Sequence, residues 1–156
     1  LGRGEIPEAR LMAKPLITPM HQRTEALNVG GLRITVLASR SDTGNYEIFH
    51  VIGEEGNGPG SHYHPWDESI YVTKGDVHCG VGGVETVASS GALIHIPAGT
   101  VHWFMFCEGG GELVTITSDG NASEMFRAFS QGINWESPDR EELVKLAARY
   151  GQVVVD

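Results

Sequence analysis

Cysteine is scarce in this sequence, and basic residues are outnumbered by acidic ones. The only two cysteines, Cys79 and Cys107, form no Cys-x-x-Cys pair, so nothing supports a cysteine-based metal or redox motif. We interpret both as reduced thiols in or near the core, and the sequence leaves a disulfide between them open. The 11 Lys and Arg residues face 20 Asp and Glu, for a net charge of −9 without a basic stripe. This composition excludes nucleic acid and an anionic membrane surface as expected partners.

Long apolar runs are also missing. No stretch is long and apolar enough to span a bilayer, and no basic segment precedes an apolar one in the manner of a leader. We therefore expect the protein in the cytoplasm. The chain begins with Leu1, while Met12 opens the stretch MAKPLITPM, which is typical of a natural start. We expect residues 1–11 to stem from a cloning vector and assign them no function.

Glycine, in contrast, is abundant, with 21 residues among 156, and only 20% of the residues are charged. A single turn-rich β domain fits this composition better than a helical bundle or a disordered chain. Short segments of alternating or continuous apolar character recur between turn signals, at residues 32–38, 46–52, 68–73, 77–81, 84–88, 92–96, 101–107 and 113–117. They predict an all-β jelly-roll barrel over residues 30–120, preceded by an arm over residues 1–29.

The hydrophobic period lengthens after residue 120, which predicts two C-terminal α-helices over residues 121–156. Asn121 and Glu124 have the spacing of a helix-capping pair. The apolar stripe Met125, Phe126 and Phe129 is interpreted as packing against the barrel and not as a binding feature. A second helix is expected to start at Ser137-Pro138 and to stop at Gly151, with a short edge strand after it.

Four potential metal ligands stand out against this background. His62 and His64 are two residues apart, so both side chains point to the same face of an extended segment. Glu68 follows a turn at Pro65, and His102 is the last residue of the run GALIHIPAGTVH, which glycine and proline interrupt. A lone His-x-His is usually accidental, but three imidazoles and a carboxylate inside an apolar barrel are costly to bury without a cation. The mixed nitrogen and oxygen set suits Ni, Mn, Fe, Co or Zn better than Mg or Ca.

These residues resemble the two motifs of the cupin superfamily. The spacing Gly56-x5-His62-x-His64-x3-Glu68-x6-Gly75 matches the first motif at every defined position. The spacing Gly91-x5-Pro97-x-Gly99-x2-His102 matches the second, although Phe106 stands where that motif usually has Asn. The resemblance implies a double-stranded β-helix, the cupin form of the jelly roll, and a small single-domain member.

The strand phases predict which side chains surround the ligands. Ile70 and Val72 share a face with Glu68, and Phe104 and Phe106 follow His102 on its face, so these four side chains should form the walls of an apolar substrate pocket. His50 joins the pocket if Ile48 and Ile52 face inward, but Phe49 and Val51 could equally be the core set. His95 alternates with Ile94 and Ile96 and is expected to point away from the cavity.

Three imidazoles and one carboxylate leave coordination positions open on a five- or six-coordinate ion, as a catalytic site requires. Glu68 could bind the ion and also take a proton from a substrate hydroxyl. The ligand set resembles that of small bacterial flavonol dioxygenases (quercetinases), which implies dioxygen insertion into a flavonol-like or other small enolisable aromatic substrate. A non-oxidative isomerase, lyase or cyclase and a non-catalytic binding protein are the alternatives. Apolar residues on both faces of residues 103–107 favour a homodimer, although a covering helix would explain them too.

Overall fold

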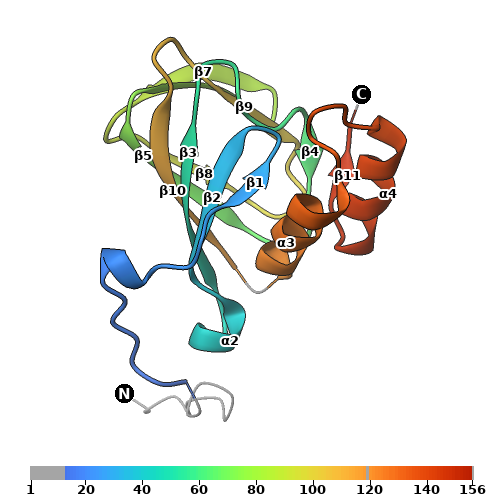
Figure 1. The fold of residues 1–156 in the computed structure, drawn as a ribbon. Coiled ribbons are helices and arrows are strands. Elements are labelled where there is room, and N and C mark those ends of the chain that lie inside the picture. Colours follow the sequence, from blue (N-terminus) through green and yellow to red (C-terminus); the bar gives the residue numbers. More distant parts are fainter. Residues whose placement is uncertain (1–12, 119, 156) are drawn as a thin grey trace, which may run out of the picture.

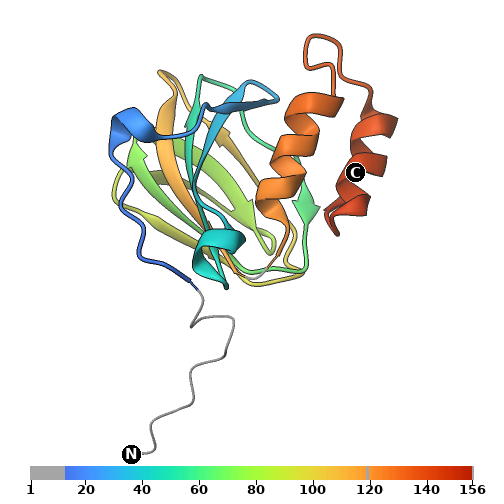
Figure 2. The same ribbon diagram turned by 60° about the horizontal axis from the view of Figure 1, so that its bottom comes forward.

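Two antiparallel sheets packed face to face form the body of the protein, and the C-terminal helices lie at one end of it (Figures 1 and 2). The computed structural model describes residues 13–118 and 120–155. One sheet has six strands in the order β1-β2-β3-β10-β5-β8, and the other has five in the order β11-β4-β9-β6-β7. This arrangement confirms the predicted all-β barrel with two C-terminal helices.

The strands follow the predicted segments closely. The six-stranded sheet contains β1 (Leu27–Val29), β2 (Leu32–Ala38), β3 (Glu47–Gly53), β5 (Glu68–Lys74), β8 (Leu93–Ile96) and β10 (Gly111–Thr117). The five-stranded sheet contains β4 (His62–Tyr63), β6 (Asp76–Val81), β7 (Val84–Ser89), β9 (His102–Phe106) and β11 (Val153–Val154). The element β1 falls within the predicted arm, where it pairs with β2 from Leu27 to Val29.

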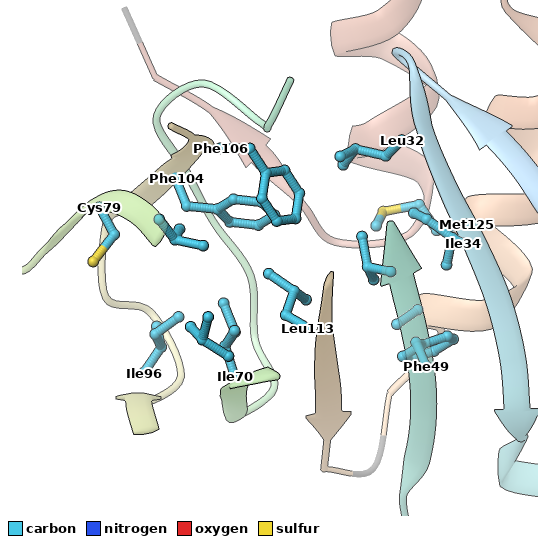
Figure 3. Packing of buried hydrophobic residues seen from close by; sticks show 14 of the residues in the cluster. Leu32, Ile34, Phe49, Ile70, Cys79, Ile96, Phe104, Phe106, Leu113 and Met125 are labelled. Atoms are coloured by element: carbon cyan, nitrogen blue, oxygen red, sulfur yellow. The ribbon is translucent and has the colours of Figure 1, made fainter. Parts of the chain in front are cut away.

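The core lies between the two sheets because alternate residues of their strands point inward. Phe49 on β3 and Leu113 on β10 come from one sheet, Phe104 and Phe106 on β9 from the other, and all four are buried. Figure 3 shows these side chains meeting in the interior. Met125, from a C-terminal helix, reaches the same core beside Ile34 (Figure 3). The helices therefore close the open end of the barrel with apolar side chains.

Two long helices and two short ones complete the fold: η1 (Met20–Gln22), α2 (Arg40–Thr43), α3 (Ala122–Gly132) and α4 (Arg140–Arg149). The short α2 helix lies in the connection between β2 and β3. The α4 helix begins at Arg140, slightly later than the predicted start at Ser137-Pro138, because the Asp139 side chain caps it by accepting hydrogen bonds from the backbone N–H groups of Glu141 and Glu142.

The predicted capping pair at the start of α3 does not form. Asn121 is the N-cap residue but makes no side-chain capping hydrogen bond. Glu47 on β3 takes over this role, because its Oε1 accepts from the backbone N–H of Ser123, 3.1 Å away, while its Oε2 accepts from the N–H of Arg40 at 3.3 Å. One fully buried carboxylate thus serves the positive N-termini of both α2 and α3.

Cys79 is buried and Cys107 is half-buried, and both are free thiols. This agrees with their interpretation as reduced thiols in or near the core. Burial raises the pKa of the Cys79 thiol. Among the described residues, none of the helices combines the length and the apolar character needed to cross a membrane.

Glu47→Ala should destabilise the protein, because it removes the acceptor of the buried N–H of Ser123 and of the N–H of Arg40. We expect a loss of about 1–3 kcal/mol in the free energy of unfolding, measured by urea denaturation. Glu47→Gln, which keeps one acceptor oxygen, should lose less. Glu85→Ala is the matched control, since Glu85 pairs with His78 at the surface and such pairs contribute little. Equal stability of Glu47→Ala and the control would contradict this role.

Candidate metal centre

Neighbouring strands bring the three predicted imidazoles together. His62 on β4 lies directly opposite His102 on β9, and their ring centroids are 4.2 Å apart. His64 follows β4 at once, and its backbone carbonyl accepts a hydrogen bond from the N–H of Gly99. All three imidazoles are buried, and their ligand nitrogens lie within 4.8 Å of one another. The structure therefore places in one cluster three residues that are up to 40 positions apart in the sequence.

Each imidazole makes the same kind of hydrogen bond with its Nδ1 atom. His62 Nδ1 lies 2.8 Å from the carbonyl oxygen of Gly60, His64 Nδ1 lies 2.9 Å from that of Trp66, and His102 Nδ1 lies 2.8 Å from that of Thr100. A carbonyl oxygen only accepts, so Nδ1 must carry the proton in each ring. In the neutral tautomer the Nε2 atom then presents a lone pair. Hydrogen bonds of this kind orient metal-binding histidines in proteins.

Glu68 brings a carboxylate to the same point. Its Oε2 lies 2.9 Å from Nε2 of His64 and 3.2 Å from Nε2 of His102. The second contact lies off the hydrogen-bond direction, and Nε2 of His102 has no hydrogen-bond partner in residues 13–118 and 120–155. Atoms that each present lone pairs repel at these distances unless a cation lies between them.

Either a proton or a metal ion could supply that positive charge, and the geometry fits a metal ion. Two ligand atoms that are each about 2.1 Å from one ion and at right angles are about 3.0 Å apart, close to both measured contacts. The unpartnered Nε2 of His102 would also gain a bond. The three-histidine cluster could therefore bind a metal ion, and its nitrogen donors suit a transition metal.

Burial and neighbouring charges set the protonation of the site. Burial, and after it the neighbouring His102, lower the pKa of His62 to about 4. Burial by itself raises the pKa of Glu68, but the imidazoles of His102 and His64 outweigh it and hold that pKa at about 2. At neutral pH, His62 is therefore neutral and Glu68 is ionised, the forms in which each can bind a metal ion.

Trp66 holds the imidazole of His64 in place by ring stacking and by a hydrogen bond. Its indole ring stacks on the imidazole with a centroid distance of 4.5 Å and an interplanar angle of 9°. Its own carbonyl oxygen accepts the Nδ1 hydrogen bond of the same imidazole. Trp66 is 3% exposed, so this arrangement is fixed inside the protein. The sequence offered no signal for it beyond an aromatic residue in the turn before Glu68.

The glycine-rich loop before His62 is fastened to the strand that carries His102. The N–H of Gly56 donates to the carbonyl of Phe106, whose own N–H donates to the carbonyl of Asn57. A Cβ atom at Gly58 would overlap the carbonyl oxygen of Phe104, so only glycine fits there. The loop thus holds His62 in a fixed orientation.

A cavity of about 90 Å³ opens onto the imidazoles and Glu68. Its walls come from both sheets and from α3, and they are mostly apolar or aromatic. The lining side chains include Phe49, Phe104, Thr115, Thr117, Met125, Phe126, Phe129 and Gln152. A wider hollow of about 310 Å³ lies between the loop at residues 58–61 and the C-terminal helices. Val29, Leu32, His62, Phe129 and Gln152 line both spaces, so the hollow borders the cavity.

The predicted pocket residues are divided between the cavity and the core. Phe104 lines the cavity. Ile70, Val72 and Phe106 are buried on the predicted faces but contribute to the core and are not among the residues that line the cavity. Ile70 and Phe106 pack among core side chains from both sheets (Figure 3), whereas the cavity is lined in part by side chains of α3.

His50 does not join the pocket. Phe49 and Val51 are the inward residues of β3, and His50 lies on the outer face, where its Nε2 is 3.1 Å from a carboxylate oxygen of Glu112. The structure therefore corrects the assignment of His50 to the pocket, because the alternative strand phase holds. His95 points away from the cavity as predicted, and its Nδ1 lies 3.0 Å from the hydroxyl of Ser69.

The α3 stripe is the main part of the site that sequence reasoning missed. Met125, Phe126 and Phe129 do pack against the barrel, but they also line the cavity. Phe126 meets Phe49 edge-on with ring centroids 5.1 Å apart. An apolar stripe at helical spacing indicates only a buried face, so nothing in the sequence distinguished core packing from lining a cavity.

Comparisons with known proteins agree with this architecture. Residues 47–118 match the family model described as "Cupin domain". Similar solved structures include an RmlC-like cupin from Shewanella frigidimarina, with 21% identity, a TM-score of 0.64 and coverage of 71% of this chain and 96% of that one. KdgF from Halomonas sp. has 19% identity, a TM-score of 0.61 and coverage of 67% and 94%. The polyketide cyclase RemF from Streptomyces resistomycificus has 17% identity, a TM-score of 0.55 and coverage of 69% and 80%.

No curated protein matches the sequence. At identities of 17–21% the structural likeness shows the fold alone. The chain therefore has the cupin fold, and residues 47–118 are similar to the cupin domain model, as the motif spacing suggested. These similar structures are diverse cupins, and none of the three is named as a flavonol dioxygenase.

Removing one imidazole should abolish metal binding. We expect zinc to raise the melting temperature of the wild-type protein, because an ion at about 100 times its dissociation constant adds about 2.7 kcal/mol to the free energy of unfolding. His102→Ala should show no such rise and should retain no zinc after dialysis. His95→Ala, which removes an outward-facing imidazole, is the control and should behave as wild type. Equal zinc content in both variants would show that the cluster is not the site.

Acid should destabilise the metal-free protein. Because the pKa of His62 is about 4 in the folded state, the unfolded chain binds the extra proton first as the pH falls. The free energy of unfolding should therefore be constant above about pH 7 and fall between about pH 6.5 and 4, by on the order of 3 kcal/mol. Glu68, with its lowered pKa, extends the loss from about pH 4.5 downward. Urea denaturation at several pH values, with chelator, measures this.

His62→Gln isolates the contribution of His62, because glutamine does not titrate. Its stability curve should be flatter than that of the wild type between about pH 6.5 and 4. Parallel curves for the two proteins would contradict the lowered pKa.

Proposed function

Because the protein contains a cupin domain with three buried imidazoles beside a carboxylate, we propose that it is a metal-dependent dioxygenase. Its substrate is a small enolisable molecule, and the part that reaches Glu68 is no larger than one small ring. The single observation that carries the proposal is the contact of 2.9 Å between Nε2 of His64 and Oε2 of Glu68 inside an apolar cavity. That contact needs a positive charge between the two atoms, which a metal ion can supply, and it leaves a carboxylate next to the substrate space.

In this proposal His62, His64, His102 and Glu68 hold one ion of Ni, Mn, Fe, Co or Zn. A bound ion of this kind would supply Lewis acidity, which lowers the pKa of a hydroxyl that coordinates to it. Three neutral imidazoles and one carboxylate leave at least one position open in a five- or six-coordinate set. The Nδ1 hydrogen bonds to Gly60, Trp66 and Thr100 keep the imidazoles in place while a substrate enters.

Glu68 is the residue that moves a proton. Among the described residues it is the only carboxylate that lines the cavity, and its lowered pKa keeps it ionised at neutral pH. An ionised carboxylate can accept the proton of a substrate hydroxyl at its Oε2 atom, whereas the imidazoles have Nδ1 protons committed to backbone carbonyls. Loss of this proton to Glu68 leaves an enolate, which the apolar walls of the cavity shield from water and whose charge a bound cation would stabilise.

Apolar walls support the use of dioxygen. Phe49, Phe104, Phe126 and Phe129 line the cavity, and an apolar, enclosed space excludes water from a reactive enolate. Flat unsaturated rings pack well against such side chains. The volume of about 90 Å³ is smaller than the roughly 150 Å³ that holds one benzene in an engineered apolar cavity. A flavonol could therefore place only one ring near Glu68, with the rest in the bordering hollow.

The same volume favours a second candidate, a non-oxidative isomerase, lyase or cyclase. A cavity of about 90 Å³ has little room for dioxygen beside a ring. Proton transfer by Glu68 to and from carbon would need no second reactant. The name of the similar polyketide cyclase RemF is consistent with such chemistry in this fold, although the fold by itself does not determine a reaction.

Glu68→Gln should abolish turnover while the imidazoles retain metal. We expect a loss of at least about 100-fold, typical for removal of a general base. The measurement is substrate loss with oxygen uptake, using protein loaded separately with Mn, Fe, Co and Ni and a panel of flavonols and single-ring hydroxy-enones. Glu112→Gln is the control, because Glu112 contacts His50 outside the cavity. Unchanged turnover in Glu68→Gln would contradict the role of Glu68.

Oxygen uptake separates the two candidates. Uptake in proportion to substrate loss supports the dioxygenase. Substrate loss, or exchange of a substrate C–H for deuterium in heavy water, without oxygen uptake and dependent on Glu68, supports the non-oxidative enzyme. If the protein shows neither activity with any of the metals, both candidate functions are contradicted.

A further inference from the structure

Two threonines occupy inward positions on β10 where apolar residues would be expected. Thr115 and Thr117 are 4% and 1% exposed, and both line the cavity. Valine has nearly the same shape and buries no hydroxyl, so a merely structural wall would favour valine here. A threonine in this place therefore raises the question of what its hydroxyl binds.

The hydroxyl of Thr117 has no hydrogen-bond partner within the described parts of the chain. In the strand register, Thr117 lies between Glu47 on β3 and Glu68 on β5. Both carboxylates are already engaged, since Glu47 accepts from the backbone at the starts of α2 and α3 and Glu68 faces the imidazoles. The Thr117 side chain thus borders the cavity with its donor and acceptor capacity unused.

We propose that Thr117 determines substrate specificity by donating a hydrogen bond from its hydroxyl to a carbonyl oxygen of the substrate. The carbonyl carbon is bonded to the carbon whose hydroxyl gives its proton to Glu68. The substrate class is accordingly a small α-hydroxy carbonyl compound or hydroxy-enone. This inference rests on the proposed function of Glu68 and deepens it.

The spacing of the two strands leads to this substrate class. Thr117 and Glu68 are directly opposite each other on neighbouring antiparallel strands. Side chains in such pairs have Cβ atoms about 4.5–5.5 Å apart. Their polar groups can therefore reach oxygens on adjacent carbons of one ligand, whereas oxygens at opposite ends of a ring would be too far apart. The small cavity volume further restricts the buried part of the ligand to a single ring.

A purely structural role for Thr117 makes a different prediction for stability. If the hydroxyl serves only a ligand, Thr117→Val removes an unpartnered buried polar atom, and the melting temperature of the metal-free protein should stay equal or rise. If the hydroxyl supports the fold, the melting temperature should fall. Thr35→Val, on the outer face of the same sheet, is the matched control for a threonine-to-valine change.

The decisive experiment is a binding cycle with two ligands and three proteins. Zinc-loaded wild type, Thr117→Val and Thr117→Ser are titrated calorimetrically with 3-hydroxypyran-4-one, which has a hydroxyl beside a carbonyl, and with phenol, which has the hydroxyl alone. Metal content is measured after each titration. We expect Thr117→Val to bind the pyranone about tenfold more weakly, as loss of one hydrogen bond implies, and phenol equally. Thr117→Ser should bind both ligands as the wild type does.

Two outcomes would overturn the proposal. One is that Thr117→Val lowers the affinity for both ligands equally, or lowers neither. The other is a wild-type protein that binds the pyranone no more tightly than phenol, which would contradict the substrate class. Because the cycle measures equilibrium binding without oxygen or turnover, its failure is distinguishable from failure of the proposed function, which is judged by the turnover of Glu68→Gln.

Discussion

The repulsion between lone pairs at the centre of the barrel is the constraint on which the site depends. Three backbone carbonyls fix the protons of His62, His64 and His102 on Nδ1, and a carboxylate oxygen of Glu68 lies close to two of the opposite nitrogens. Such an arrangement is costly inside a protein unless a cation compensates it. Burial of the apolar core between the two sheets offsets this free-energy cost. A cation is therefore the component that makes the arrangement favourable.

The rest of the molecule holds this centre in place and controls what reaches it. The glycine-rich loop ties the His62 strand to the strand of His102, and the indole of Trp66 stacks on the imidazole of His64. The α3 helix closes one side of the cavity, and the buried carboxylate of Glu47 anchors the start of that helix to β3. The C-terminal strand β11 pairs with β4, where Val154 lies opposite His62 (Figure 1). The helical extension is thus part of the site and not an appendage to it.

Much of this could be predicted from the sequence because local periodicity and motif spacing carry it. The strands, the inward phase of His102 and Phe104, and the meeting of the three histidines all follow from alternation and from punctuation by glycine and proline. The phase of β3 could not be predicted, because Ile48 to Ile52 is apolar on both faces apart from His50. The roles of Thr117 and of the α3 stripe depend on where empty space remains after packing, and local sequence does not encode this.

X-ray absorption spectroscopy of the cobalt-loaded protein would test the central claim most directly, because it counts the atoms around the ion. The account predicts three imidazole nitrogens and a carboxylate oxygen at about 2.0–2.2 Å. It also predicts one ion per chain and no sulfur ligand, since Cys79 and Cys107 belong to other parts of the barrel. Two or fewer imidazoles, or a sulfur scatterer, would contradict the claim that His62, His64 and His102 converge to bind a metal ion.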